Sequence, residues 1–150
     1  MTALKAICAE AGYSRIETYI ASGNVTFDCN VPAAKVQADL EARLLAYAGR
    51  AVGAFVRTVA DMRSVLEGNP FFDREPRHTY AFFLHEKPPR DALEHARGRT
   101  EEEIRLGKHE IYVYYPSGMG KSKLRIPAAK HATARNMNTV ARLVEMCSRI

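Results

Sequence analysis

The chain has 150 residues, of which 47% are hydrophobic and 26% are charged. This balance excludes an intrinsically disordered chain, and the length suits one domain or two small units that bury a core without help from a metal or a disulfide. No apolar run is long enough to span a bilayer and no signal-peptide pattern opens the sequence, so we expect a cytoplasmic protein without membrane contact.

Basic residues are in excess and unevenly placed. Lysine and arginine total 22 against 17 aspartate and glutamate, which gives a net charge of +5. Between Lys121 and Ile150, Glu145 is the single acid among seven basic residues: Lys121, Lys123, Arg125, Lys130, Arg135, Arg142 and Arg149. Such a field attracts phosphates, nucleic acid or acidic partners, although a solvated surface has the same composition.

The cysteines and histidines show no pattern of a metal or redox site. Cys8, Cys29 and Cys147 are far apart and lack C-x-x-C spacing, so we interpret them as free thiols, with Cys8 and Cys147 as small hydrophobes on predicted helices. The histidines are scattered, without an H-E-x-x-H motif: His78, His85, His95, His109 and His131. The sequence therefore predicts no bound metal and no cofactor.

The first half of the chain alternates helical and β-rich segments. Residues 3–11 have apolar side chains at helical spacing, and Gly12 follows as a stop. Residues 15–20 and 24–27 predict a hairpin in which Gly23 takes a positive φ. Beyond it we expect a helix from Pro32 to Gly49, a strand over residues 52–57, and a helix over residues 59–67 that ends at Gly68-Asn69-Pro70.

The second half repeats this alternation. The predicted elements are a strand over residues 79–84, a helix over 90–96, a hairpin of strands 102–106 and 110–115, a short helix beginning in 121–125, and a helix over 138–150. Strand hairpins with helices that cover one face of a sheet are the pattern of an α+β sandwich.

Four segments carry a resemblance to a known family. They are TYIASGNV from Thr18, NPF from Asn69, YVYYPSGMGKSKL from Tyr112 and TARNMNTV from Thr133. With them the chain resembles the bacterial family catalogued as domain of unknown function 1697. The resemblance implies two ferredoxin-like α/β sandwich units, residues 1–72 and 73–150, or one intertwined domain. It implies no reaction, cofactor or substrate.

The chain departs from that family at two places. Family members begin with a strand and a glycine-containing basic loop, whereas here the first predicted helix starts almost at Met1. The first unit therefore lacks its N-terminal strand, and unpaired strand edges invite association. Either the recorded start is too late, or the gap is filled by a shifted register or by a neighbouring chain, which would make a homo-oligomer. Met137 stands where the family often has tryptophan.

The strongest local signal is the glycine-containing turn YPSGMGKSK from Tyr115. Backbone N–H groups at a helix start can hold an anion, and Lys121 and Lys123 add positive charge. The complete P-loop pattern fails, since its leading glycine would fall at Tyr115. We predict anion-binding residues here, with a purely structural turn as the alternative: Gly118, Gly120, Lys121, Ser122 and Lys123.

Two further polar segments are candidates for binding. Asn136 or Asn138 suits a cap for the last helix, which is the use that we favour. The alternative is that Arg135 and Asn136 recognise a carboxylate, phosphate or base edge if they meet the glycine turn in space. Ser22 and Asn24 have the composition of either a binding loop or an ordinary hairpin turn.

Three hypotheses about function remain at this point. The first is a binding module for a phosphate-bearing ligand or nucleic acid, where Tyr112, Tyr114 and Tyr115 either stack bases or pack in the core. The second is a small enzyme that acts on a phosphorylated or acidic molecule with Lys121, Arg135, His109 or Tyr115. The third is an interaction or oligomerisation domain, marked by an apolar patch.

Overall fold

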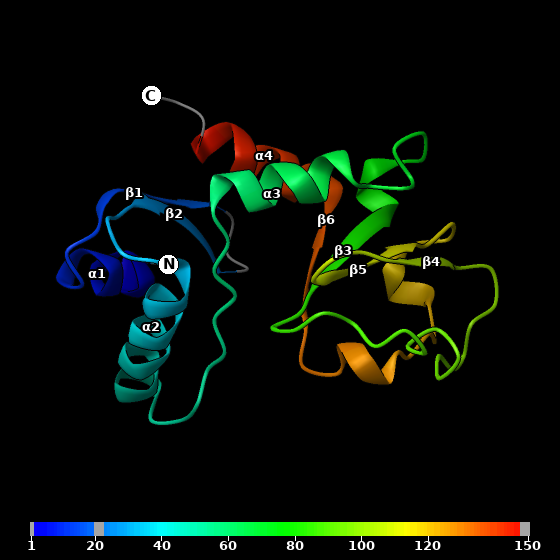
Figure 1. Ribbon diagram of the computed structural model, residues 1–150, viewed down its shortest axis with the longest axis horizontal. Helices are drawn as coiled ribbons and strands as arrows, with labels where there is room; N and C mark the ends of the chain where they lie inside the picture. Colours follow the sequence, from blue (N-terminus) through cyan, green and yellow to red (C-terminus); the bar gives the residue numbers. More distant parts are fainter. Residues whose placement is uncertain (1, 20–22, 148–150) are drawn as a thin grey trace. The chain divides into compact units, whose positions relative to one another are not determined.

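The computed structural model describes residues 2–19 and 23–147 (Figure 1). Within those residues it contains four α-helices and two separate antiparallel sheets. This combination confirms the predicted α+β class. No helix of the described part is long and apolar enough to cross a membrane.

The chain divides into two compact units that differ from the predicted ones. The first unit consists of residues 1–59 and 143–150, and the second consists of residues 60–142. The predicted boundary after residue 72 lies inside the second unit. One physical reason is a hydrogen bond of 2.8 Å that the hydroxyl of Tyr112 donates to the carbonyl oxygen of Val65, which ties the helix before residue 72 to the second sheet.

The first unit packs two helices against a two-stranded sheet. Its elements are α1 (Thr2–Glu10), β1 (Ser14–Tyr19), β2 (Asn24–Asp28) and α2 (Ala33–Ala48). The strands pair antiparallel, and Cys8, Tyr13, Val36 and Leu40 form much of the buried core. Cys8 is fully buried, which agrees with its predicted role as a small hydrophobe. Cys147 is only half-buried, and the described residues form no disulfide.

Local signals were accurate at the glycines of this unit and wrong at one strand. Gly23 has φ +88° and Gly49 ends α2 with φ +73°, as predicted. The predicted strand over residues 52–57 is wrong, because residues 51–58 have no strand assignment. Ala54 and Val56 pack on the core, as alternate residues of a strand would. The N–H of Ala54, however, donates to the carboxylate of Glu41 at 3.2 Å and not to a carbonyl of a neighbouring strand.

The second unit is built on a four-stranded sheet (Figure 1). Its strands lie in the order β4-β5-β3-β6, and each neighbouring pair is antiparallel. This is the strand order of a βαββαβ unit. The elements are α3 (Val59–Glu67), β3 (Thr79–Phe83), β4 (Glu103–Leu106), β5 (Glu110–Tyr114), β6 (Thr133–Asn136) and α4 (Met137–Cys147). The last turn of α4 belongs to the first unit.

The two faces of this sheet have different neighbours. Phe82 pairs with Ile111, and their face carries the main core of the unit. Tyr112 lies on the other face, where its hydroxyl reaches α3. Because side chains alternate along a strand, the register assigns each residue of β6 to one of these two faces.

Two local predictions for the second unit are wrong, and one of its strands was not predicted. Residues 90–96 form a succession of turns, with Ala92 N–H bonded to the carbonyl of Pro89, and not a helix. A helix so short is marginal without strong packing. The helix expected in residues 121–125 is replaced by a single 3₁₀ turn, Met119–Lys121. Strand β6 was not expected.

Candidate functional site

A pocket of about 580 Å³ lies in the second unit beside the glycine-containing turn. We call it the loop pocket and define it by its lining residues: Phe82, Tyr115, Met119, Ser122, Leu124, Arg125, Ile126, Pro127, Ala129 and Lys130. Its volume falls within the range of small-molecule sites.

The floor of the loop pocket is apolar. Phe82, Tyr115, Leu124 and Ile126 belong to the main core of the unit, and Tyr115 meets Tyr80 edge to face with 5.6 Å between ring centroids. Burial, assisted by the charge of Glu102, raises the pKa of Tyr115 to about 12. The phenol is therefore neutral at physiological pH, and this floor can pack against an uncharged ring or chain.

The wall of the loop pocket is held by a contact between distant segments. Arg97 and Arg125 exchange two backbone hydrogen bonds of 2.8 and 2.7 Å. Gly98 follows with φ +71°, and a Cβ at this position would lie 2.2 Å from the carbonyl oxygen of Lys123. The wall therefore depends on a glycine that lets two backbones approach each other.

The charge at the loop pocket is positive. Arg125 and Lys130 are exposed lining residues, and no aspartate or glutamate lines the pocket. In the part of the chain that the structure describes, neither cation forms an ion pair with a carboxylate. Arg125 does donate from one guanidinium nitrogen to the carbonyl of Leu124 at 2.9 Å, which restricts its orientation.

A buried carboxylate supports the pocket from behind. Glu102 is 4% exposed, and one of its oxygens accepts the N–H of Thr100 at 2.7 Å. Its other oxygen accepts the hydroxyl of Ser122 at 2.5 Å. The hydrogen bond from Ser122 is the largest cause that lowers the pKa of Glu102. Glu102 is therefore an anion that fixes the Ser122 side chain.

Of the five predicted anion-binding residues in the glycine-containing turn, one lines the loop pocket. Ser122 lines it, whereas Gly118, Gly120, Lys121 and Lys123 do not. Gly118 has φ +89° and donates its N–H to the carbonyl of Tyr115, and the N–H of Ser122 donates to Met119. These two amides are engaged in turns. Lys121 and Lys123 are exposed, and they add positive charge on either side of Ser122 in the sequence.

Arg135 and Asn136 lie on β6 and are absent from the pocket lining. Arg135 pairs with Ala81 and so shares the sheet face opposite to that of Phe82. Its guanidinium donates to the hydroxyl of Thr133 and the carbonyl of Ala134, both at 2.8 Å, and burial lowers the pKa of Arg135. The structure therefore does not join Arg135 to Ser122 at this pocket.

Asn136 acts as the helix cap, which is the use that the sequence favoured. Its side-chain oxygen accepts the N–H of Thr139 at 2.9 Å. We expect Asn136→Ala to lower the free energy of unfolding by about 1 kcal/mol, because one amide of the first turn loses its acceptor. Urea unfolding followed by circular dichroism measures this. Asn138→Ala, at an exposed helical position, is the matched control, and an equal loss in both variants would contradict the cap.

The remaining predicted residues lie elsewhere. Ser22 is outside the described residues, and Asn24 is buried in the hairpin with its amide donating to the carbonyl of Tyr19 at 3.2 Å. Of the residues proposed for an enzyme, Tyr115 lines the loop pocket and His109 lies at the exposed turn between β4 and β5. The described residues contain no cluster of three or more histidine, cysteine or acidic side chains that suits a metal.

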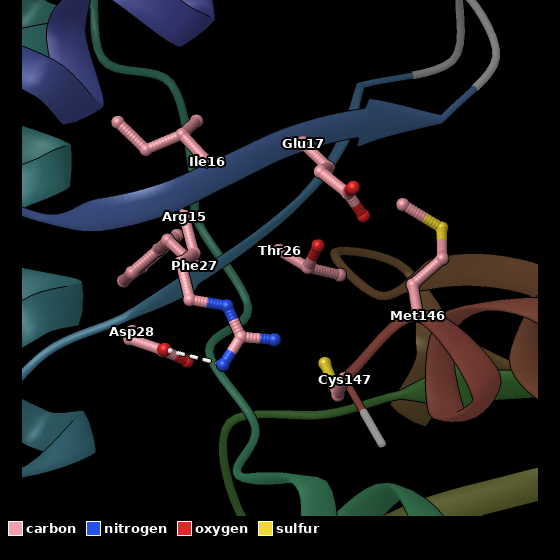
Figure 2. Close-up of a pocket in the computed structure, with 8 residues that line it drawn as sticks. All are labelled: Arg15, Ile16, Glu17, Thr26, Phe27, Asp28, Met146 and Cys147. Atoms are coloured by element: carbon pink, nitrogen blue, oxygen red, sulfur yellow. Dashed lines mark ion pairs between the residues drawn. The ribbon is translucent and has the colours of Figure 1, made fainter. Parts of the chain in front are cut away.

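A second, smaller pocket of about 250 Å³ belongs to the first unit (Figure 2). Its lining mixes both signs of charge, since Glu17 and Asp28 accompany Arg15, and Arg15 is paired with Asp28 at 3.1 Å. Met146 and Cys147 form another part of the wall. The paired charges make it a weaker anion site than the loop pocket.

Sequence reasoning did not single out Arg125 and Lys130. Both belonged to the basic stretch after Lys121, which was the available signal. The basic stretch alone did not indicate which of its residues line the pocket. The position of Arg125 depends on its bridge to Arg97, and no local sequence pattern links these two residues.

Comparisons with known proteins show the fold and the family separately. The structure of the conserved bacterial protein SP0830 from Streptococcus pneumoniae is similar, with a TM-score of 0.79 and 21% sequence identity over 99% of this chain and 89% of that one. At this identity the likeness shows the fold alone. No curated protein matches the chain. The family model described as "Protein of unknown function (DUF1697)" matches residues 1–112, and the chain therefore belongs to the DUF1697 family.

Proposed function

We propose that the second unit binds a phosphate-bearing small molecule with an apolar body in the loop pocket. The observation that carries the proposal is the combination of an apolar floor with two cations and no lining carboxylate. The ring or chain of the ligand packs on Phe82, Tyr115 and Leu124. Its phosphate accepts hydrogen bonds from Arg125 and Lys130, whose charges are satisfied best by an anion.

The side chains of the floor indicate the kind of apolar body that the pocket accepts. Buried aromatic and aliphatic side chains favour a flat, uncharged group, and aromatic rings stack on such surfaces. Aryl phosphates and nucleotides combine this group with the required anion. Inorganic phosphate has the charge alone, so we expect it to bind more weakly than phenyl phosphate.

Titration of the protein with inorganic phosphate, phenyl phosphate and adenosine monophosphate tests the proposal, with amide chemical shifts as the readout. Arg125→Gln and Lys130→Gln should each weaken phenyl phosphate binding by about tenfold to 100-fold, because a charge-assisted hydrogen bond contributes roughly 1.5–3 kcal/mol. The affinity should also fall as salt rises, since the two cations are exposed.

Lys108→Gln is the matched control. Lys108 is an exposed lysine at the turn between β4 and β5 and does not line the loop pocket, so the same loss of charge should leave the affinity unchanged. The proposal fails if phenyl phosphate does not bind, or if all three variants weaken binding equally, which would indicate a response to net charge. Binding of a single-stranded oligonucleotide without phenyl phosphate binding would favour an open basic surface instead.

A further inference from the structure

The side-chain hydroxyl of Ser122 has one hydrogen-bonding position left for a ligand. A serine hydroxyl has one proton to donate and two lone pairs that accept. The Ser122 hydroxyl donates to Glu102 at 2.5 Å and accepts the backbone N–H of Leu124 at 3.1 Å. One lone pair therefore remains, and Ser122 lines the loop pocket.

The proton of Ser122 is held firmly at Glu102. A carboxylate accepts only, and hydrogen bonds to an ionised acceptor are roughly twice as strong as neutral ones. Glu102 is buried, so turning the hydroxyl proton toward the pocket would leave one carboxylate oxygen without this donor. The hydrogen bonds to Glu102 also lower its pKa, which keeps it ionised near neutral pH.

We infer that the loop pocket selects ligands that donate a hydrogen bond to Ser122, in addition to an apolar body and an anion at Arg125 and Lys130. This inference rests on the proposed function and narrows its ligand class to amino-substituted aryl or heteroaryl phosphates, including nucleotides with an exocyclic amine. Glu102 does not touch the ligand. It is a positioning residue that sets the polarity of Ser122.

A series of substituted phenyl phosphates tests the selection. The 3- and 4-amino compounds offer a donor, and the 3- and 4-acetyl compounds offer an acceptor on the same ring. We expect the better amino isomer to bind the unmodified protein about threefold to tenfold more tightly than either acetyl isomer, in line with about 0.5–1.5 kcal/mol for one hydrogen bond. Equal affinities for the two substituents would overturn the inference.

Glu102→Gln provides the sharper test because it reverses the polarity. The glutamine oxygen can still accept from Thr100, while its amide nitrogen now donates to Ser122 where a carboxylate oxygen accepted. The Ser122 proton is then released toward the pocket, and the preference should change from the amino to the acetyl compounds. A role of Glu102 in folding alone would change all affinities together and leave the preference intact, which would overturn the inference.

Ser122→Ala completes the design and decides the matter if Glu102→Gln does not fold. It removes the acceptor, so amino and acetyl compounds should bind alike, at the affinity of phenyl phosphate. A preference that persists in Ser122→Ala would overturn the inference. Phenyl phosphate carries neither substituent, so its binding tests the proposed function alone. If it binds and the protein shows no preference between amino and acetyl compounds, the inference fails and the proposed function stands.

Discussion

Replacement of Gly98 by alanine is expected to lower the free energy of unfolding of the second unit by about 2–5 kcal/mol. The added Cβ would lie 2.2 Å from the carbonyl oxygen and 2.9 Å from the carbonyl carbon of Lys123. These atoms are backbone and cannot turn away, so relief requires a shift of the pocket wall, at a cost of about 1–3 kcal/mol. The positive φ of +71° adds about 1–2 kcal/mol for any residue with a Cβ.

Gly120→Ala is the control for this experiment. Gly120 lies in the glycine-containing turn, but no atom comes within 4 Å of a Cβ built there and its φ is not positive. We expect a change within about 0.5 kcal/mol. Urea unfolding measures both variants, and Gly98→Ala should also weaken phenyl phosphate binding. Equal stability of the two variants would show that the approach of Gly98 to Lys123 does not limit the fold.

Ile111→Ala is expected to lower the free energy of unfolding by about 3–4 kcal/mol. Ile111 has no exposed surface and lies on β5, an interior strand of the sheet of the second unit. The truncation removes buried methyl and methylene groups and leaves a cavity among side chains that form the floor of the loop pocket. The midpoint of urea unfolding should fall with an unchanged slope.

Phe72→Ala is the control that separates the loss of a buried side chain in Ile111→Ala from the loss of any hydrophobic side chain. Phe72 belongs to the same unit and is 83% exposed, so its larger truncation should change stability by less than about 0.5 kcal/mol. If Phe72→Ala cost as much as Ile111→Ala, the assignment of the core to the sheet face of Phe82 and Ile111 would be wrong.

Much of the fold was accessible from local signals. Runs of β-rich residues identified β3 and β5, and Gly23 and Gly49 were assigned correctly, as a turn residue with a positive φ and as the end of a helix. Residues 52–57 show the limit of this reasoning. They were predicted as a strand, and Ala54 and Val56 do pack on a core, but local composition does not report whether a neighbouring strand completes a ladder.

The charge of the candidate site and one lining residue, Ser122, were predictable from the sequence. The basic stretch after Lys121 indicated positive potential, yet it did not separate Arg125, which lines the pocket, from Arg135, which lies on β6 facing away from Phe82. That distinction depends on the pairing of β6 with β3, which is a contact between segments far apart in the chain. The role of Ser122 depended likewise on Glu102, twenty residues earlier.

The division of the first unit into two stretches of chain has a consequence for synthesis on the ribosome. Residues 60–142 emerge completely before residues 143–147, so the second unit can fold while the first still lacks its last helical turn. The wall that Met146 and Cys147 contribute to the smaller pocket can therefore form only after all of the chain between it and the opposite wall has been translated.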